Sequence, residues 1–527
     1  MGTDQAVNRY KKIKIRFVDS LKSITLADIA VVSLATKKDS EVLVLPTGQK
    51  KITVGIGKKK DVNRRKFILQ SRNIIDLAKQ NKIRKLVINF SDFIMRHLKM
   101  SDSEIAEILA VNFEMANFEF IQYKTLPEEG ENFVEEIIVV SHDNAVKKGF
   151  RKGQVVGEGV NMCRVLANTP GGVMTPGTLA KQAKEAAKKT GVKVKVLGIK
   201  EISKLKMGGV LGVSSGSEEE PKFMVLEYVA SSKDKPVVLI GKGVTFDSGG
   251  LNLKPSDSIY GMHTDMSGGA SVLAAIITAA KLKLKKNIVG LIPAVENMPS
   301  GSSYRPGDIL HTMSGKTIEV MNTDAEGRII LADALTYAKK YNPELVVDIA
   351  TLTGAAMIAL GQRASAIFTK SDKLEKKFRD MGEKSGDYVW PLPLWDEYEA
   401  DIKGTFGDIA NTGKTRYGGA ITAAMFLYQF AKDYPWVHID IAPRTTAVDD
   451  ELLAKRAGFS VAETRRLLAG FSRRTPAGAR WRALADRKLA ELESRIQEAQ
   501  RMQAVLRVLG RCECPTLDDC ARGMRNA

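Results

Sequence analysis

Seven charged residues in one stretch of the sequence could do chemistry together. Each lies in a short polar turn, usually rich in glycine, beside an apolar run, which is where strands end and helices begin in an α/β sheet. They are Lys242, Asp247, Lys254, Asp265, Asp324, Glu326 and Arg328. Four carboxylates in one cleft repel one another and resist ionisation unless a cation neutralises them. The set therefore predicts a divalent metal site, with enough oxygen ligands for two ions that activate water for a hydrolytic reaction.

Each of these residues also has an ordinary interpretation when it is taken alone. A single Asp or Lys is most often a solvated surface charge. Arg328 has the alternative of a plain ion pair with Asp324 or Asp333. Asp324 and Glu326 are two residues apart, so they face one site only on an extended or turning backbone, which fits a loop that ends where a helix begins near Glu326.

The apolar runs around these residues predict the elements that position them. The expected strands are Val237–Ile240, Ile288–Val295, Thr317–Val320 and Leu345–Ala350, and the expected helices are Ser267–Lys283 and Glu326–Lys340. This alternation predicts parallel strands of one sheet with right-handed crossovers. We therefore expect the polar residues to converge at the carboxyl edge of that sheet.

The 527 residues have room for two to four domains. We expect an α/β fold in which an N-terminal α/β domain is followed by an α/β catalytic domain with a mixed, largely parallel sheet and then by an all-α tail. The predicted boundaries are 1–150 for the N-terminal domain, 151–169 for a connecting helix, 170–442 for the catalytic domain and 443–527 for the tail.

The composition narrows the class of protein. Lys and Arg number 80 against 61 Asp and Glu, a formal charge of +19, which we interpret first as a solvated lysine-rich surface and second as a nucleic-acid face. No apolar run has the length of a membrane span and the N-terminus lacks a signal-peptide core, so we expect a cytoplasmic protein without a membrane partner. Four cysteines argue against a disulfide framework.

Four sequence blocks around the charged residues are similar to those of a known family. GKGVTFDSGGLNLKPS, MHTDMSGGA, ENMPSGSSYRPGDIL and NTDAEGRIILADAL resemble the signature blocks of the leucyl aminopeptidase family, the cytosol aminopeptidases. NTDAEGR is the most diagnostic of these strings, and the resemblance runs from near the N-terminus to Ala442. It implies a metal-dependent aminopeptidase that removes N-terminal, Leu-like residues from peptides, assembled as a homo-hexamer of two trimers.

The resemblance also implies a set of metal ligands. Asp247 and Glu326 would bridge two divalent ions per subunit, with Asp324 completing the more exchangeable site and Lys242 with Asp265 the tighter one. Manganese or zinc would fill these sites, and magnesium is a third option. A lysine ligand must be neutral, which a strong positive charge nearby permits.

Further roles are implied for residues around the metals. Lys254 would polarise the scissile carbonyl and stabilise the oxyanion, and Arg328 would hold a bicarbonate ion that acts as the general base. The nucleophile would be a hydroxide that bridges the metals. Met262, Leu352 and Gly354 match positions near the substrate side chain, whereas we interpret His263 as structural.

The chain departs from the family after Ala442. The family continues with Gly and a short loop beside the substrate pocket, whereas Pro443 and Arg444 follow here, which leaves the side-chain preference open. Residues 446–527 are rich in Arg and resemble the C-terminal part of MerR-family transcriptional regulators. A helix over 476–509 carries a coiled-coil-like apolar stripe that could pair with a partner helix.

Three cysteines follow that helix. Cys512, Cys514 and Cys520 could hold a soft metal ion or respond to redox state, but they are one ligand short of a closed tetrahedral site. The helix-turn-helix of MerR regulators is absent, so specific DNA recognition does not carry over. We interpret the tail as a dimerisation helix with a metal or thiol site. Two alternatives for the whole chain are a basic DNA-binding or regulatory protein with weak or no peptidase activity, and a non-native fusion.

Overall fold

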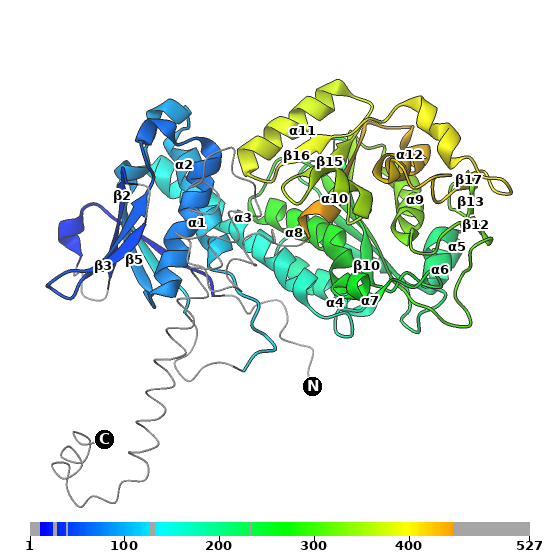
Figure 1. The fold of residues 1–527 in the computed structure, drawn as a ribbon, viewed down its shortest axis with the longest axis horizontal. Coiled ribbons are helices and arrows are strands. Elements are labelled where there is room, and N and C mark those ends of the chain that lie inside the picture. The colour runs from blue at the N-terminus through cyan, green and yellow to red at the C-terminus, as the bar shows by residue number, and fades with distance from the viewer. Residues whose placement is uncertain (1–10, 25–28, 38–39, 126–131, 232, 446–527) are drawn as a thin grey trace, which may run out of the picture. The chain divides into compact units, whose positions relative to one another are not determined.

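The computed structural model describes residues 11–24, 29–37, 40–125, 132–231 and 233–445 (Figure 1). The helix expected over 476–509 and the three tail cysteines lie outside these residues. Within them, two α/β sheets account for most of the strands, and the larger one is mixed with a parallel centre, which confirms the predicted fold class for this part of the chain. None of the described helices combines the length and apolar character needed to cross a membrane.

The first sheet has six strands in the order β1-β6-β5-β2-β4-β3. All neighbours are parallel except β3, which runs antiparallel to β4 at the edge. The strands are β1 (Lys14–Val18), β2 (Ala30–Ala35), β3 (Glu41–Val44), β4 (Lys50–Gly55), β5 (Lys85–Asn89) and β6 (Glu136–Val140). Helices α1 (Arg64–Gln80), α2 (Asp102–Ala116) and α3 (Asn144–Asn168) contribute buried side chains to the core of this sheet.

Helix α3 (Asn144–Asn168) begins before residue 151, where the sequence predicts the start of the connecting helix. Three glycines spaced four residues apart bring α3 close to α2. A Cβ atom at Gly149 would lie 2.3 Å from Ser103 O, one at Gly153 2.5 Å from Glu107 O, and one at Gly157 2.6 Å from Glu114 Cβ. Any side chain on this face would therefore push the two helices apart.

The second sheet has nine strands and carries the charged residues. Eight of them follow the order β16-β15-β18-β14-β9-β11-β8-β7, and β10 pairs with β11. The strands are β7 (Lys193–Leu197), β8 (Lys222–Tyr228), β9 (Val237–Gly241), β10 (Gly243–Asp247), β11 (Ile288–Asn297), β14 (Leu345–Ala350), β15 (Ser365–Phe368), β16 (Val389–Pro391) and β18 (Trp436–Asp440). The central strands β9, β10, β11, β14 and β18 are all parallel, so their carboxyl ends share one edge.

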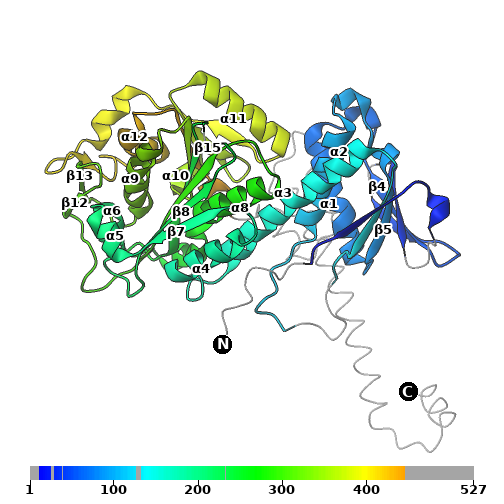
Figure 2. The same ribbon diagram turned by 180° about the vertical axis from the view of Figure 1, so that it is seen from behind.

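Helices cover both faces of this sheet because its strands alternate buried side chains between two cores. In β9, Val238 and Ile240 join the core that includes α9 (Glu326–Ala338) and α12 (Gly419–Ala431), while Leu239 packs against the core of α8 (Ser267–Lys281). Helix α4 (Pro176–Ala187) lies against β7 and β8, as seen from behind in Figure 2. The other helices are α5 (Ile199–Lys204), α6 (Gly208–Ser214), α7 (Ser256–Ile259), α10 (Gly354–Leu360) and α11 (Asp372–Ser385).

One expected strand does not belong to the large sheet. The sequence places Thr317–Val320 in the same sheet as its neighbours, but β13 (Thr317–Glu319) forms a separate three-stranded sheet with β12 (Ile309–His311) and β17 (Ile409–Ala410). A tight turn with Gly315 at φ 87° folds β12 and β13 into an antiparallel pair. That prediction was wrong because an apolar run indicates a strand but not its partner.

Candidate metal centre

Lys242 enters the site from an interruption between two strands. β9 ends at Gly241 and β10 begins at Gly243, and both pair in parallel with β11. The Lys242 backbone is held on both sides, because its N–H donates to Ile349 O at 3.0 Å and its carbonyl accepts from Gly269 N at 2.8 Å. The sequence predicted a loop here, but the chain continues as a strand that carries Asp247 at its end.

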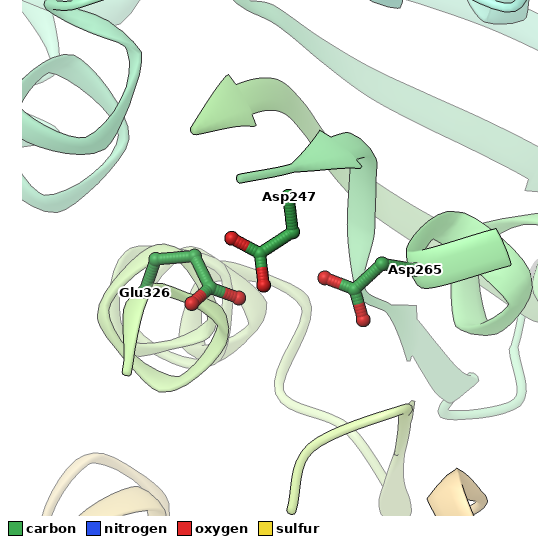
Figure 3. Close-up of side chains that lie close together, drawn as sticks. All are labelled: Asp247, Asp265 and Glu326. Carbon is green, nitrogen blue, oxygen red and sulfur yellow. The ribbon is translucent and has the colours of Figure 1, made fainter. Parts of the chain in front are cut away.

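Three carboxylates from separate elements meet at the carboxyl edge of the sheet. Asp247 ends β10, Asp265 lies in the short 3-10 helix Met262–Met266, and Glu326 opens α9. One oxygen of each lies within 4.8 Å of the others, and Figure 3 shows the three groups pointing toward a common point. All three residues are buried. Such a set of convergent oxygens can hold a divalent cation.

Two lysines pair with these carboxylates. Lys242 Nζ lies 2.8 Å from Asp265 Oδ2 and 2.8 Å from Glu326 Oε1. Lys254 Nζ lies 2.8 Å from Asp247 Oδ2 and also pairs with Asp324, the most exposed carboxylate of the group. The structure thus brings six of the seven predicted charged residues into one cluster of two ion-paired sets, linked by the convergence of Asp247, Asp265 and Glu326.

The pKa shifts reflect a site with too much negative charge. Burial raises the pKa of Asp265 and Glu326, and repulsion from Asp247 adds to the shift while Lys242 opposes it. Burial likewise raises the pKa of Asp324, with Asp247 again contributing. For Lys242, burial disfavours the charge, but the surrounding carboxylates outweigh it and raise the pKa. Two ammonium groups neutralise only half of four carboxylates.

The donor set fits a divalent metal. Glu326 Oε2 is a buried carboxylate oxygen that accepts no hydrogen bond from any described residue. A buried acceptor left in this state is costly, and a cation would satisfy it. Carboxylate oxygens together with an amine nitrogen suit manganese or zinc.

Polar residues that the sequence analysis did not single out orient the carboxylates. Asn297, at the end of β11, donates from Nδ2 to Asp247 Oδ1 at 2.9 Å and to Thr323 O at 2.9 Å. Thr351, directly after β14, donates from Oγ1 to Asp265 Oδ1 at 2.5 Å, and its carbonyl accepts from Lys242 Nζ at 3.0 Å. Both lie at the carboxyl end of a buried strand, Asn297 as its last residue and Thr351 directly after it, so the rule that selected Asp247 could have found them.

Arg328 lies on α9, one turn or less from Glu326, and is buried. Its Nη1 donates to Asn411 O at 2.6 Å, and its Nε has no acceptor among the described residues. Burial lowers the pKa of Arg328 to about 10, against the attraction of Glu326 and Asp440. The alternative partner Asp333 instead accepts backbone hydrogens from other segments.

The residues expected near a substrate come from two segments beside the carboxylates. Met262 is half-buried in the 3-10 helix of Asp265, and so is His263, whose pKa is lowered by burial. Leu352 is partly buried against the core after β14, and Gly354 is exposed at the start of α10.

Comparison with known proteins gives two family matches. The model "Cytosol aminopeptidase family, catalytic domain" matches residues 161–467, and the model "MerR, DNA binding" matches residues 452–509. The first match continues past Ala442, where the sequence analysis ended the resemblance, and overlaps the second.

Individual proteins give the same picture. The chain is 47% identical over 341 residues to the probable cytosol aminopeptidase of Burkholderia mallei (strain SAVP1). The aligned residues are 64% of this chain and 67% of that protein. The probable cytosol aminopeptidase of Burkholderia pseudomallei (strain K96243) matches with the same identity and coverage. Among solved structures, the bottromycin maturation enzyme BotP in complex with Mn is similar with a TM-score of 0.70 and 30% identity, over 79% of this chain and 92% of that chain.

Proposed function

The chain belongs to the cytosol aminopeptidase family, and from this premise we propose that it removes N-terminal residues, Leu-like ones preferred, from peptides with the help of two divalent metal ions. The observation that carries the proposal is the buried cluster of Asp247, Asp265 and Glu326, whose carboxylates converge and leave Glu326 Oε2 without a hydrogen-bond donor among the described residues. A manganese-bound relative of the same fold supports metal dependence.

We propose that Asp247 and Glu326 hold both ions, that Lys242 and Asp265 complete the tighter site, and that Asp324 completes the more exchangeable one. The greater exposure of Asp324 is consistent with this order, since its side chain is 34% exposed and that of Asp265 is 6% exposed. Manganese, zinc or magnesium would supply an acidic water and neutralise charge that develops on the substrate.

Lys254 is suited to stabilise the oxyanion. Its ammonium lies at the edge of the cluster, paired with Asp247 and Asp324, and its side chain is 14% exposed, so a substrate carbonyl can approach it. Burial lowers the pKa of Lys254, but the surrounding carboxylates raise it by more. The pKa therefore lies above its usual value, and the group stays charged. A fixed cation aimed at a developing oxyanion lowers the barrier of acyl transfer.

Arg328 is suited to hold bicarbonate as the general base. Its Nε is buried and has no acceptor in the part of the chain that the structure describes, and a planar anion could accept from it. A guanidinium prefers planar, bidentate anions. Met262, Leu352 and Gly354 would line the pocket for the first side chain of the peptide.

We also propose the wider setting that the sequence suggested. The names of the relatives support a cytosolic location, and the family resemblance supports a homo-hexamer. The proposal keeps the domain boundaries after residues 150, 169 and 442. It also keeps a tail that dimerises or binds metal through its cysteines. The match of residues 452–509 to the MerR model supports a second candidate, a DNA-binding or regulatory role. The test of this role is binding to duplex DNA that persists in an Asp324→Ala variant.

The proposed activity can be tested with leucine p-nitroanilide and added Mn²⁺ or Zn²⁺. We expect metal-dependent turnover of the full chain, and a fall in kcat of about 10²–10³-fold or more for Glu326→Ala and Lys254→Ala. Lys286→Ala is the control, because Lys286 pairs with Glu344 at the surface. No turnover from folded, metal-loaded protein would refute the proposal.

A further inference from the structure

We propose that Asp440 is a positioning residue, which holds the turn of residues 351–354 so that this turn orients the ligands of the tighter metal and the substrate pocket. The inference rests on the proposed function and adds a residue to it. Asp440 ends β18 opposite Ala350, the last residue of β14, and is fully buried. It lies at the same carboxyl edge as the metal cluster but is not one of its ligands.

Both carboxylate oxygens of Asp440 are used to hold the turn. Oδ1 accepts from Leu352 N at 3.1 Å, and Oδ2 accepts from Thr353 Oγ1 at 2.7 Å. Thr353 in turn caps α10, because its Oγ1 accepts from Ala356 N at 3.1 Å. Hydrogen bonds to a carboxylate are stronger than those between neutral groups. Asp440 therefore fixes the backbone of the turn between β14 and α10, which is not part of a β-strand.

The other end of the turn touches the metal ligands. Thr351 Oγ1 donates to Asp265 Oδ1 at 2.5 Å, and Thr351 O accepts from Lys242 Nζ at 3.0 Å. Thr351 is thus adjacent to the residue that Asp440 holds and in contact with both proposed ligands of the tighter ion. A shift of the turn would move these contacts and the Leu352 side chain together.

Asp440 also links the turn to the chain just after its own strand. Its Oδ1 accepts from Ala442 N at 3.1 Å, the last residue before Pro443. The carboxylate therefore joins the turn of residues 351–354 to the start of the segment that follows β18. An Asn side chain keeps one acceptor for the backbone but loses the negative charge, and its amide would have to donate to Thr353 Oγ1 instead of accepting from it.

The test uses the full chain after removal of metal with a chelator. Mn²⁺ binding is followed by electron paramagnetic resonance, and kcat and KM are measured for leucine and alanine p-nitroanilide. The variants are Asp440→Asn, Thr353→Val and Thr353→Ser, and the last keeps the hydroxyl. The control is Asp333→Asn, since Asp333 is equally buried and accepts backbone hydrogen bonds from Val210 and Met313 instead of from the turn of residues 351–354.

We expect Asp440→Asn and Thr353→Val to lower the affinity of the tighter site for Mn²⁺ by about 10- to 100-fold, because each change removes a hydrogen bond to a charged group. The ratio of kcat/KM for leucine over alanine substrates should change by about tenfold, while Thr353→Ser stays near the wild type. Asp333→Asn should change thermal stability but neither Mn²⁺ affinity nor this ratio.

Unchanged Mn²⁺ affinity and unchanged selectivity in Asp440→Asn and Thr353→Val would overturn the inference. If Asp440→Asn does not fold, the comparison of Thr353→Val with Thr353→Ser decides in the same way. A wild-type chain that binds Mn²⁺ without turnover refutes the proposed function alone, and the difference in Mn²⁺ affinity between the variants then supports or overturns the role of Asp440.

Discussion

Replacing Lys242 with Met should destabilise the metal-free protein more than the same change at Lys254. Lys242 pairs with Asp265 and Glu326 at 2.8 Å each, and none of the three side chains is more than 6% exposed. Met matches the apolar stem of the lysine side chain but lacks its ammonium group, so two buried carboxylates lose their cation. Breaking a buried ion pair from one side costs about 3–5 kcal/mol.

The matched change Lys254→Met should cost less. Lys254 is 14% exposed and its partner Asp324 is 34% exposed, so water compensates part of the lost attraction. We expect a cost of about 1–2 kcal/mol, between the values for surface and buried pairs.

Equilibrium urea unfolding of chelator-treated protein, followed by tryptophan fluorescence, measures both costs. Trp390, Trp395 and Trp436 report on the part of the chain that carries the site. Added Mn²⁺ should restore part of the stability of Lys242→Met, because a bound cation again neutralises the carboxylates and ligand binding stabilises the folded state. Equal losses in the two lysine variants, or a Lys242→Met variant as stable as the wild type, would refute the electrostatic account of the cluster.

Two further predictions concern single positions. In Gly327→Ala, the new Cβ would lie 2.5 Å from Lys242 Cε, so we expect Mn²⁺ affinity to fall about tenfold or more although Ala favours a helix, and unchanged affinity would contradict this. Burial raises the pKa of Glu114 from 4.5 to about 7. The folded state thus binds the proton more tightly, and its stability falls by up to about 3 kcal/mol as pH rises through this window. The free energy of unfolding, measured by urea at about pH 5 and about pH 8, should therefore differ less between the two pH values in Glu114→Gln than in the wild type. An unchanged pH dependence in the variant would argue against this role of Glu114.

The fold class could be predicted because it depends on local patterns. Short β-branched runs such as Val237–Ile240, separated by helical stretches such as Ser267–Lys283, require a sheet covered by helices, since each element must bury its apolar side. The charged residues were visible for a related reason. A carboxylate that follows a buried strand lies at the edge where loops meet, so Asp247 could be selected without coordinates, although its role as a metal ligand stays a prediction.

Strand partners could not be predicted in the same way. The run at 317–320 has the composition of any other strand, yet it pairs with two short strands outside the large sheet. The strand after Lys242 was missed because Gly243 and the polar residues near it indicate a turn. Pairing with β11 overrides this local preference.

From the residue pattern alone, the α/β fold, the family resemblance and a set of clustered carboxylates could be predicted. How those carboxylates are held became visible only in the folded chain. Asn297, Thr351 and Asp440 are ordinary polar residues in the sequence, and they matter because distant strands place them against Asp247, Asp265 and the turn after β14. Charge and periodicity are properties of a local stretch, whereas a hydrogen bond between segments dozens of residues apart exists only after the chain has folded.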